Sequence, residues 1–272
     1  AKAIEHLQVG PTDARTTVIT SSGIVEGLQV QVIRDETELE AVRRARDSVL
    51  ANISHEFRTP LAAQLASIEL LLEGMETLQP AQQKDLVMSL ERGALRLTGL
   101  IDNLLEGVRI ESGQLNIRHQ SVDLTEVVAD AQALVGSLLT LRRQTLEVTI
   151  PGDLPHIEGD KPRLTQAFVN LLANANKFAP DGSIIRIGAA ATDARVLAWI
   201  EDDGPGPKAD ESDAIFARFQ RGSGEEPEPG GLGLGLWIVK SIIDRHAGTI
   251  ALLRTQQGRT RFTISLPAEA CA

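Results

Sequence analysis

The chain has 272 residues, of which 42% are hydrophobic and 24% are charged, a balance typical of a folded soluble protein. This composition excludes a collagen-like repeat and disorder throughout the chain. The 27 basic and 37 acidic residues give a net charge of −10, so the chain as a whole offers no electrostatic basis for binding nucleic acid.

Aromatic and sulfur-containing residues are scarce. Aromatic residues make up 3% of the chain and tyrosine is absent, so the cores must depend on Leu, Ile, Val and Ala. The one cysteine, Cys271, excludes an internal disulfide and a zinc cluster built on cysteines, and it is compatible with a reducing cytosol. No apolar run approaches the roughly 18–20 residues of a membrane span, and no signal-peptide pattern is present. We therefore expect this chain to be cytoplasmic without membrane contact, and a membrane anchor upstream stays open.

Residues 1–35 are predicted to be β-structure. Two runs rich in Val, Ile and Thr, 14–21 and 28–34, flank a segment with turn chemistry at 22–27. Two strands alone bury too little surface to be stable. We expect this segment to be the end of a larger domain, or a hairpin packed on another element.

A helical period begins at Glu36 and fades near Gly74, with Pro60 inside it. A second helix is predicted from Pro80 to just before Gly113. Two long helices with a short connection form an antiparallel hairpin, and one hairpin cannot cover both apolar stripes. Pairing with a second copy into a dimeric four-helix bundle is the natural solution. The stripes are Leu39, Val42, Arg46, Val49, Ile53, Phe57, Leu61, Leu65, Ile68 and Leu72, and then Leu86, Leu90, Ala94, Leu97, Ile101, Leu104 and Val108.

The character of the sequence changes again from residue 115 to residue 268. Strand and helix patterns are mixed there, which predicts an α/β sandwich with a largely antiparallel sheet. The expected strands are 115–119, 146–150, 184–189, 196–201, 249–253 and 261–266, and the expected helices are 124–141, 163–178 and 234–246.

The first segment with candidate chemistry runs from Asn52 to Leu61. Ile53 and Phe57 share the apolar face of the helix, so His55 points away from it and is expected to be exposed. Glu56 is a carboxylate that could accept a proton from the imidazole ring. Thr59 lies one helical turn from His55. The alternative is an ordinary surface histidine on a coiled-coil arm.

The second segment is the helix from Asn170 to Phe178. Asn170, Asn174 and Lys177 fall on one stripe of an otherwise apolar helix. An amide oxygen suits Mg²⁺, and lysine complements phosphate. The alternative is a set of satisfied polar groups at a helix end.

Two glycine-rich segments follow. Asp202 directly follows a strand and precedes the turn 203–206, where a carboxylate could accept the exocyclic amine of adenine and glycines would let a ligand approach the backbone. The segment 230–236 opens a helix, whose N-terminal amides can bind phosphate, and the polar stretch 222–227 before it fits a mobile lid. Asp-Gly turns and glycine-rich loops are common, so each signal is weak by itself.

Taken in this order, the four segments resemble the sensor histidine kinases of two-component signalling over about residues 36–268. Residues 54–61 are similar to the phosphoacceptor box of that family, 170–178 to its asparagine box, 202–206 to its first glycine box and 215–221 to its phenylalanine box. Residues 231–236 are similar to its second glycine box, and Gly258, Thr260 and Phe262 to its last. Residues 34–37 weakly resemble the junction that follows a PAS sensor domain.

The resemblance implies an α+β protein in three parts. Residues 1–35 would be the last strands of a PAS-like domain, and 36–114 the dimerisation and phosphotransfer hairpin. Residues 115–268 would be an ATP-binding sandwich of the kind shared with gyrase and heat-shock chaperones. His55 would be phosphorylated from ATP and the phosphoryl group passed to an aspartate of a response regulator, with Glu56 as base and Thr59 supporting phosphatase activity.

The resemblance also implies roles in the nucleotide site. Asn174 would bind Mg²⁺ and Asn170 would order the site, Lys177 and Arg221 would meet the phosphates, and Arg218 would anchor the lid. Asp202 would bind adenine, and Gly233 and Gly235 would offer backbone N–H groups. Phe178, Gly204, Gly206, Gly231, Leu234 and Thr260 complete the predicted site.

Some positions depart from the family pattern: Leu232 stands where Thr is frequent, Pro207 where Ile is usual, and Phe178 in place of Tyr. Two other functions stay open. One is a dimeric scaffold that has lost phosphoryl transfer, and the other is an ATPase of the chaperone or gyrase type without a phosphohistidine. The second would leave the His55 helix unexplained.

Overall fold

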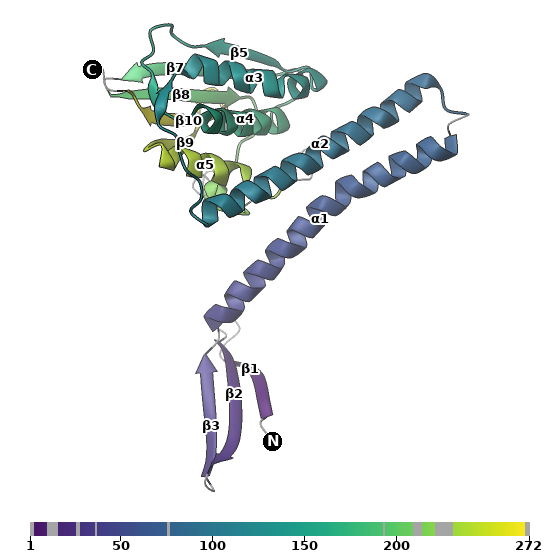
Figure 1. Ribbon diagram of the computed structural model, residues 1–272, viewed down its shortest axis with the longest axis vertical. Coiled ribbons are helices and arrows are strands. Elements are labelled where there is room, and N and C mark those ends of the chain that lie inside the picture. The colour runs from purple at the N-terminus through teal and green to yellow at the C-terminus, as the bar shows by residue number, and fades with distance from the viewer. Residues whose placement is uncertain are drawn as a thin grey trace. The chain divides into compact units, whose positions relative to one another are not determined.

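The computed structural model (Figure 1) describes residues 3–9, 16–25, 28–35, 37–74, 77–192, 194–208, 214–220 and 231–269. Its compact units are residues 1–59 and residues 60–272. The long first helix, α1 (Thr37–Gly74), crosses the boundary between them.

The first unit contains a three-stranded antiparallel sheet of order β1-β2-β3, followed by the start of α1. Its strands are β1 (Ala3–Val9), β2 (Thr16–Val25) and β3 (Leu28–Asp35). The sequence predicted two of these strands and missed β1, whose residues include Glu, His and Gln and lack a Val/Ile/Thr run. The predicted turn at 22–27 was also placed too early, because β2 continues to Val25 and Gly23 pairs with Val30.

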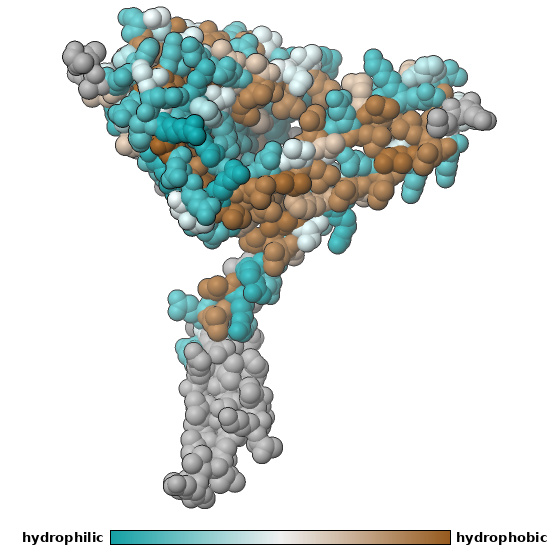
Figure 2. Space-filling model, viewed as in Figure 1, coloured by the Kyte–Doolittle hydropathy of each residue, from teal (hydrophilic) through white to brown (hydrophobic). Residues whose placement is uncertain are grey.

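In the second unit, the end of α1 and helix α2 (Pro80–Glu111) form the predicted hairpin. The backbone N–H groups of Thr77 and Leu78 donate to the Gly74 carbonyl at 2.9 and 2.8 Å, which closes the turn. Gln82 accepts from the Gln79 backbone at 3.0 Å and caps α2. Many large apolar side chains of this hairpin are exposed, and Figure 2 shows them as brown areas over its helices. They include Leu61, Leu65, Ile68, Leu70, Leu72, Val87, Leu95, Ile101, Leu105 and Val108.

The rest of the second unit is the predicted α/β sandwich. Its five-stranded sheet has the order β5-β7-β8-β10-β9, with one parallel pair, β5 with β7. Helices α3 (Leu124–Leu141), α4 (Lys161–Phe178) and α5 (Gly235–Arg245) cover one face (Figure 1). The strands are β5 (Thr145–Thr149), β7 (Ile184–Thr192), β8 (Arg195–Asp202), β9 (Thr249–Arg254) and β10 (Thr260–Pro267).

One predicted strand was wrong. Residues 115–119 are not a strand, and the pairing begins one residue later, where β4 (Gln120–Val122) pairs with β6 (Ile157–Gly159). Leu115 is nevertheless buried and its carbonyl accepts from Arg245 at 2.6 Å. The segment 115–119 therefore has the apolar pattern of a strand, because Leu115 is buried, but it pairs with no strand in the described part of the chain. The sequence missed β4 and β6 because each has only three residues.

The core lies between the sheet and the helices. Alternate residues of β8 and β10 are buried, and the apolar face of α4 packs on β7 and β8 with Phe168 fully buried. Helix α3 is, by length and composition alone, apolar enough to cross a membrane, with a mean hydropathy of 1.3. Its buried residues, among them Val127, Ala131 and Val135, belong to this core, whereas Leu134 and Leu141 of the same helix are exposed.

Gly188 of β7 lies directly opposite Trp199 of β8. A Cβ at Gly188 would lie 2.2 Å from Cζ2 of the Trp199 indole, closer than any real contact. We predict that Gly188→Ala lowers stability by about 1–3 kcal/mol because the ring must shift. Thermal unfolding monitored by circular dichroism will measure the change.

The matched control is Gly136→Ala in α3, where an added Cβ meets nothing within 4 Å. This change should leave the melting temperature unchanged or slightly raised, because alanine favours helix. If Gly188→Ala melts like the unaltered protein, the close approach of β7 to Trp199 is not a packing constraint.

Candidate functional site

His55 lies on α1 in the first unit and is exposed, as predicted. Its neighbour Glu56 is 8% exposed. The Thr59 hydroxyl donates to the His55 carbonyl at 3.2 Å. Pro60 has no N–H to give to the Glu56 carbonyl, yet α1 continues through it to Gly74. The helix therefore presents the imidazole to solvent beside a carboxylate.

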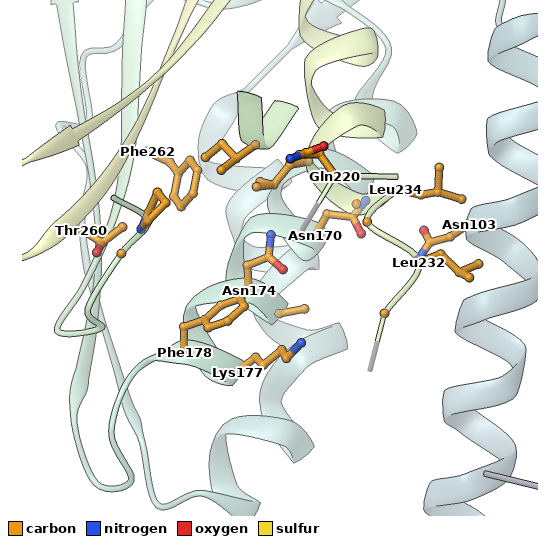
Figure 3. A pocket seen from close by; sticks show the side chains of 18 of the residues that line it. Asn103, Asn170, Asn174, Lys177, Phe178, Gln220, Leu232, Leu234, Thr260 and Phe262 are labelled. Atoms are coloured by element: carbon orange, nitrogen blue, oxygen red, sulfur yellow. The ribbon is translucent and has the colours of Figure 1, made fainter. Parts of the chain in front are cut away.

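A cavity of about 310 Å³ lies in the second unit (Figure 3). Helix α4 supplies Asn170, Asn174, Lys177 and Phe178. The first three recur on one face of the helix, as the sequence predicted. The Lys177 ammonium lies 4.9 Å from the centre of the Phe178 ring. The wall formed by α4 thus combines two amides, one cation and one aromatic ring.

Asp202 ends β8 and lines the cavity, where it is 3% exposed. Its Oδ1 accepts the backbone N–H of Gly204 at 2.7 Å. Burial is the main cause that raises the pKa of Asp202 to about 6, and the neighbouring carboxylates of Asp203 and Glu201 raise it further. The hydrogen bond from Gly204 and the charge of Arg254 lower this pKa, but their effect is smaller. Asp202 is therefore a buried acceptor that is largely ionised at neutral pH.

The turn after β8 approaches β10 closely. Gly206 has a φ of +61°, and a Cβ there would lie 2.6 Å from the Thr260 hydroxyl. Gly206 and Thr260 both line the cavity, whereas Gly204 does not. Gly204 holds the Asp202 carboxylate instead. Glycine at position 206 is thus required by conformation and by space.

The glycine-rich segment forms another wall of the cavity, through Gly231, Gly233, Leu234 and Gly235. Gly233 has a φ of +65°, and its carbonyl accepts from the backbone N–H of Phe219 at 3.1 Å. Helix α5 begins at Gly235, so its unpaired N-terminal amides lie at the cavity. A helix N-terminus with glycines beside it suits a phosphate group.

Two predicted residues lie elsewhere. Arg218 is not part of the cavity wall; its guanidinium pairs with Glu111 of α2 at 2.6 Å and lies over the rings of Phe219 and Trp237. The predicted role of Arg218 at the nucleotide therefore has no support in this arrangement. Arg221 and the predicted lid at 222–227 lie outside the described residues.

The sequence missed Leu100 and Asn103, which line the cavity from α2. Figure 3 shows the Asn103 side chain reaching from its helix toward the glycine-rich segment. Both residues belong to the hairpin rather than to the sandwich, and nothing in their spacing indicates such a contact. A signal for them could come only from the tertiary structure.

Among the residues that the structure describes, no group of three or more His, Cys, Asp or Glu side chains could hold a metal ion. A cation at this cavity would depend on neutral oxygens such as the Asn174 amide together with the oxygens of a ligand. That donor set fits Mg²⁺, which is commonly held by one or two protein groups plus substrate phosphates.

Comparison with family models gives two matches. Residues 45–113 match the His Kinase A (phospho-acceptor) domain, and residues 159–270 match the histidine kinase-, DNA gyrase B- and HSP90-like ATPase family. His55 lies in the first match. The α4, β8 and glycine-rich walls of the cavity lie in the second.

Similar proteins agree with these matches. The chain is 32% identical over 239 residues to the alginate biosynthesis sensor protein KinB of Pseudomonas aeruginosa, covering 88% of this chain and 40% of KinB. It is 30% identical over 260 residues to the sensor protein KdpD of Escherichia coli, covering 93% of this chain and 28% of KdpD. The chain thus spans less than half the length of these two relatives.

Solved structures agree as well. Full-length ShkA in complex with AMPPNP shares 27% identity at a TM-score of 0.58, over 82% of this chain and 46% of ShkA. The histidine kinase AdeS of Acinetobacter baumannii, at 24% identity and a TM-score of 0.58, shares the fold over 79% of this chain and 98% of that structure. The predicted architecture, a helical hairpin followed by an α/β sandwich of the gyrase type, is confirmed. The chain belongs to the histidine kinases of two-component signalling, with a phospho-acceptor domain followed by an ATPase-type domain.

Proposed function

We propose that this chain transfers the γ-phosphoryl group of ATP to His55 and then passes it to an aspartate of a response regulator. The observation that carries the proposal is the cavity, which brings together α4, the turn after β8 and the glycine-rich segment. These segments are far apart in sequence and supply complementary groups for a base, a cation and phosphates. They occur in a chain whose exposed His55 lies in a phospho-acceptor domain.

The base would be recognised by Asp202. A buried carboxylate can accept the exocyclic amine of adenine but cannot donate to the carbonyl of guanine, so the site favours adenine. The raised pKa of about 6 supports this role, because burial disfavours the charged carboxylate and a further hydrogen-bond donor would stabilise it. An adenine amine would supply one.

The phosphates would lie between α4 and the start of α5. Lys177 neutralises their charge, and Gly233 and Gly235 offer backbone N–H groups. Arg221, outside the described residues, is the second cation that the family resemblance implies. Asn174 would hold Mg²⁺, and Asn170 would order the same wall. The cation supplies charge neutralisation and alignment of the γ-phosphoryl group.

The transfer itself needs positioning more than covalent chemistry from the protein. A ring nitrogen of His55 forms a bond to the γ-phosphorus while the bond from phosphorus to the bridging oxygen breaks and ADP leaves. Glu56 accepts the ring proton. The phosphoryl group then moves from His55 to an aspartate carboxylate of the regulator, which docks on the hairpin.

The proposed organisation has three parts, with boundaries at 35 and 114. The antiparallel sheet β1–β3 supports assigning residues 1–35 to the end of a PAS-like sensor domain. The exposed apolar side chains of the hairpin support a homodimer. We place this chain in the cytoplasm, where ATP and a response regulator are available.

The central test is labelling of the purified chain with γ-labelled ATP and Mg²⁺. We predict a label that is lost in acid and kept in base, as expected for phosphohistidine, and absent from His55→Gln. A chain that binds ATP without becoming labelled would be a scaffold. A chain that hydrolyses ATP without becoming labelled would be an ATPase of the chaperone type.

Asn174→Asp is predicted to weaken binding of a non-hydrolysable ATP analogue by about tenfold or more, because a carboxylate beside the phosphates replaces a neutral oxygen. Calorimetric titration measures this loss. Asn116→Asp is the control, since Asn116 is exposed and outside the cavity wall. Equal affinity in the two variants would remove Asn174 from the site.

The dimer is tested by light scattering at micromolar concentration, which should give about twice the chain mass of 29.3 kDa. Leu65→Glu should shift the mass toward the monomer, because it places a charge on the exposed apolar face of the hairpin. Leu134→Glu is the matched control, since Leu65 and Leu134 are 59% and 65% exposed and Leu134 lies on α3. A monomeric unaltered chain contradicts the bundle.

Thr59 has a hydroxyl that can orient a water toward the phospho-aspartate of a docked regulator. We predict that Thr59→Ala keeps His55 labelling and loses phosphatase activity, measured as decay of purified phospho-regulator with ADP. Thr98→Ala is the control, because the Thr98 hydroxyl makes the same kind of bond, to the Ala94 carbonyl at 3.0 Å. Equal decay with Thr59→Ala and the unaltered chain would mean that Thr59 serves only its helix. Loss of both activities would indicate a disturbed helix near Pro60.

A further inference from the structure

Arg254, the last residue of β9, lies behind the turn that carries Asp202. Its Nη1 donates to the Gly204 carbonyl at 3.0 Å and to the Thr260 hydroxyl at 3.0 Å. The Thr260 hydroxyl donates to the same Gly204 carbonyl at 3.0 Å. The backbone N–H of Gly204 in turn donates to the Asp202 carboxylate. Four residues from three segments thus form one closed set of hydrogen bonds against the cavity.

Arg254 differs from the neighbouring arginines of the same hairpin. Arg259 and Arg261 of β9–β10 pair with Glu201 at 3.0 and 2.6 Å. Arg254 forms no ion pair within the described part of the chain; it donates to a carbonyl and to a hydroxyl. Both of these bonds go to the Asp202 turn and to the residue that supports it.

We propose that Arg254 is a positioning residue for base recognition: it holds Gly204 and Thr260 together, and so fixes the turn that aims Asp202 into the cavity. This inference rests on the proposed function, in which the cavity binds ATP. Arg254 does not line the cavity, so it acts through Gly204, Thr260 and Asp202 and does not touch the nucleotide.

The charges around Asp202 support this role. Arg254 lowers the pKa of Asp202 against the larger effect of burial and the repulsion by Asp203 and Glu201. Its guanidinium thus helps to keep the carboxylate ionised, the state that accepts an amine. In the described part of the chain, the other charged groups on the surrounding elements include Lys177 of α4, Lys208 after the turn, Arg186 of β7, which lies 3.8 Å from Asp203, and Arg259 and Arg261 of the β9–β10 hairpin.

The test is calorimetric titration of the whole chain with a non-hydrolysable ATP analogue and Mg²⁺ between pH 5.5 and 8.5. The affinity of the unaltered chain should fall as the pH drops through about 6, because Asp202 becomes protonated. Arg254→Met should weaken binding about fivefold at pH 7.5, the effect of one loosened hydrogen-bonded contact, and should move the midpoint of the pH dependence upward. Arg254→Lys keeps the positive charge, so the midpoint of its pH dependence should equal that of the unaltered chain. Its affinity should lie between those of Arg254→Met and the unaltered chain.

Two further variants make the result specific. Asp202→Asn shows the pH dependence that remains from the nucleotide phosphates, which titrate near pH 6 themselves. Arg195→Met is the matched control, because Arg195 also binds a hydroxyl and a carbonyl, those of Ser265, at the opposite end of the β8–β10 pair. Arg195→Met should keep both the affinity and the midpoint.

The failures can be told apart. If the unaltered chain prefers ATP over GTP and Arg254→Met keeps its affinity, Arg254 does not position the turn. A weaker Arg254→Met variant with an unshifted midpoint also overturns the proposal, because a general structural role would produce that result. If the unaltered chain binds no nucleotide, or binds the GTP analogue equally well, the proposed function fails and the role of Arg254 fails with it.

Discussion

The site depends on how the C-terminal end of α4 is held. A helix end leaves carbonyl groups without intrahelical partners, and here Asn176 and Ala179 are buried residues. Gln144 donates its amide to the carbonyls of Asn176, Ala179 and Pro180 at 3.1–3.2 Å and accepts from Asn176 at 2.6 Å. Arg142 donates to the carbonyls of Asn176 and Lys177. Because these bonds fix where α4 ends, they also fix Asn174, Lys177 and Phe178 in the cavity wall.

The buried carboxylate of Asp202 affects the stability of the fold. Its pKa in the folded chain, about 6, lies above the ordinary 3.8, so folding favours the protonated carboxyl. This favourable contribution is fully present below pH 3.8 and is lost as the pH rises through about 6. At neutral pH the cavity therefore contains a buried charge that destabilises the protein, and a ligand that donates to it recovers part of that free energy. Binding residues of this kind oppose stability while they serve recognition.

The sequence predicted the elements whose signals are local and long. The two hairpin helices, the helices of the sandwich and the residues of α4 and the glycine-rich segment are where period and spacing placed them. It failed where the signal is short or comes from tertiary contacts. Strands β4 and β6 have three residues each, and β1 lacks β-branched density. No local pattern could predict that Asn103 lines the cavity, or that Arg218 pairs with Glu111, 107 positions away.

Asn103 and Glu111, the two residues whose contacts the sequence could not predict, both belong to α2. Besides Asn103, α2 contacts the sandwich through the buried carboxylate of Glu106, which pairs with Arg163 at the start of α4. It also approaches the sandwich at Gly107, where an added Cβ would lie 3.4 Å from the Trp237 ring. Exposed pairs such as Glu111 with Arg218 contribute only about 0–1 kcal/mol, whereas losing the partner of a buried carboxylate costs more. The Glu106–Arg163 pair therefore anchors α2 to the helix that carries Asn170 and Asn174. The second helix of the hairpin is thus part of the cavity wall, and the cavity has its present shape only while α2 stays on the sandwich.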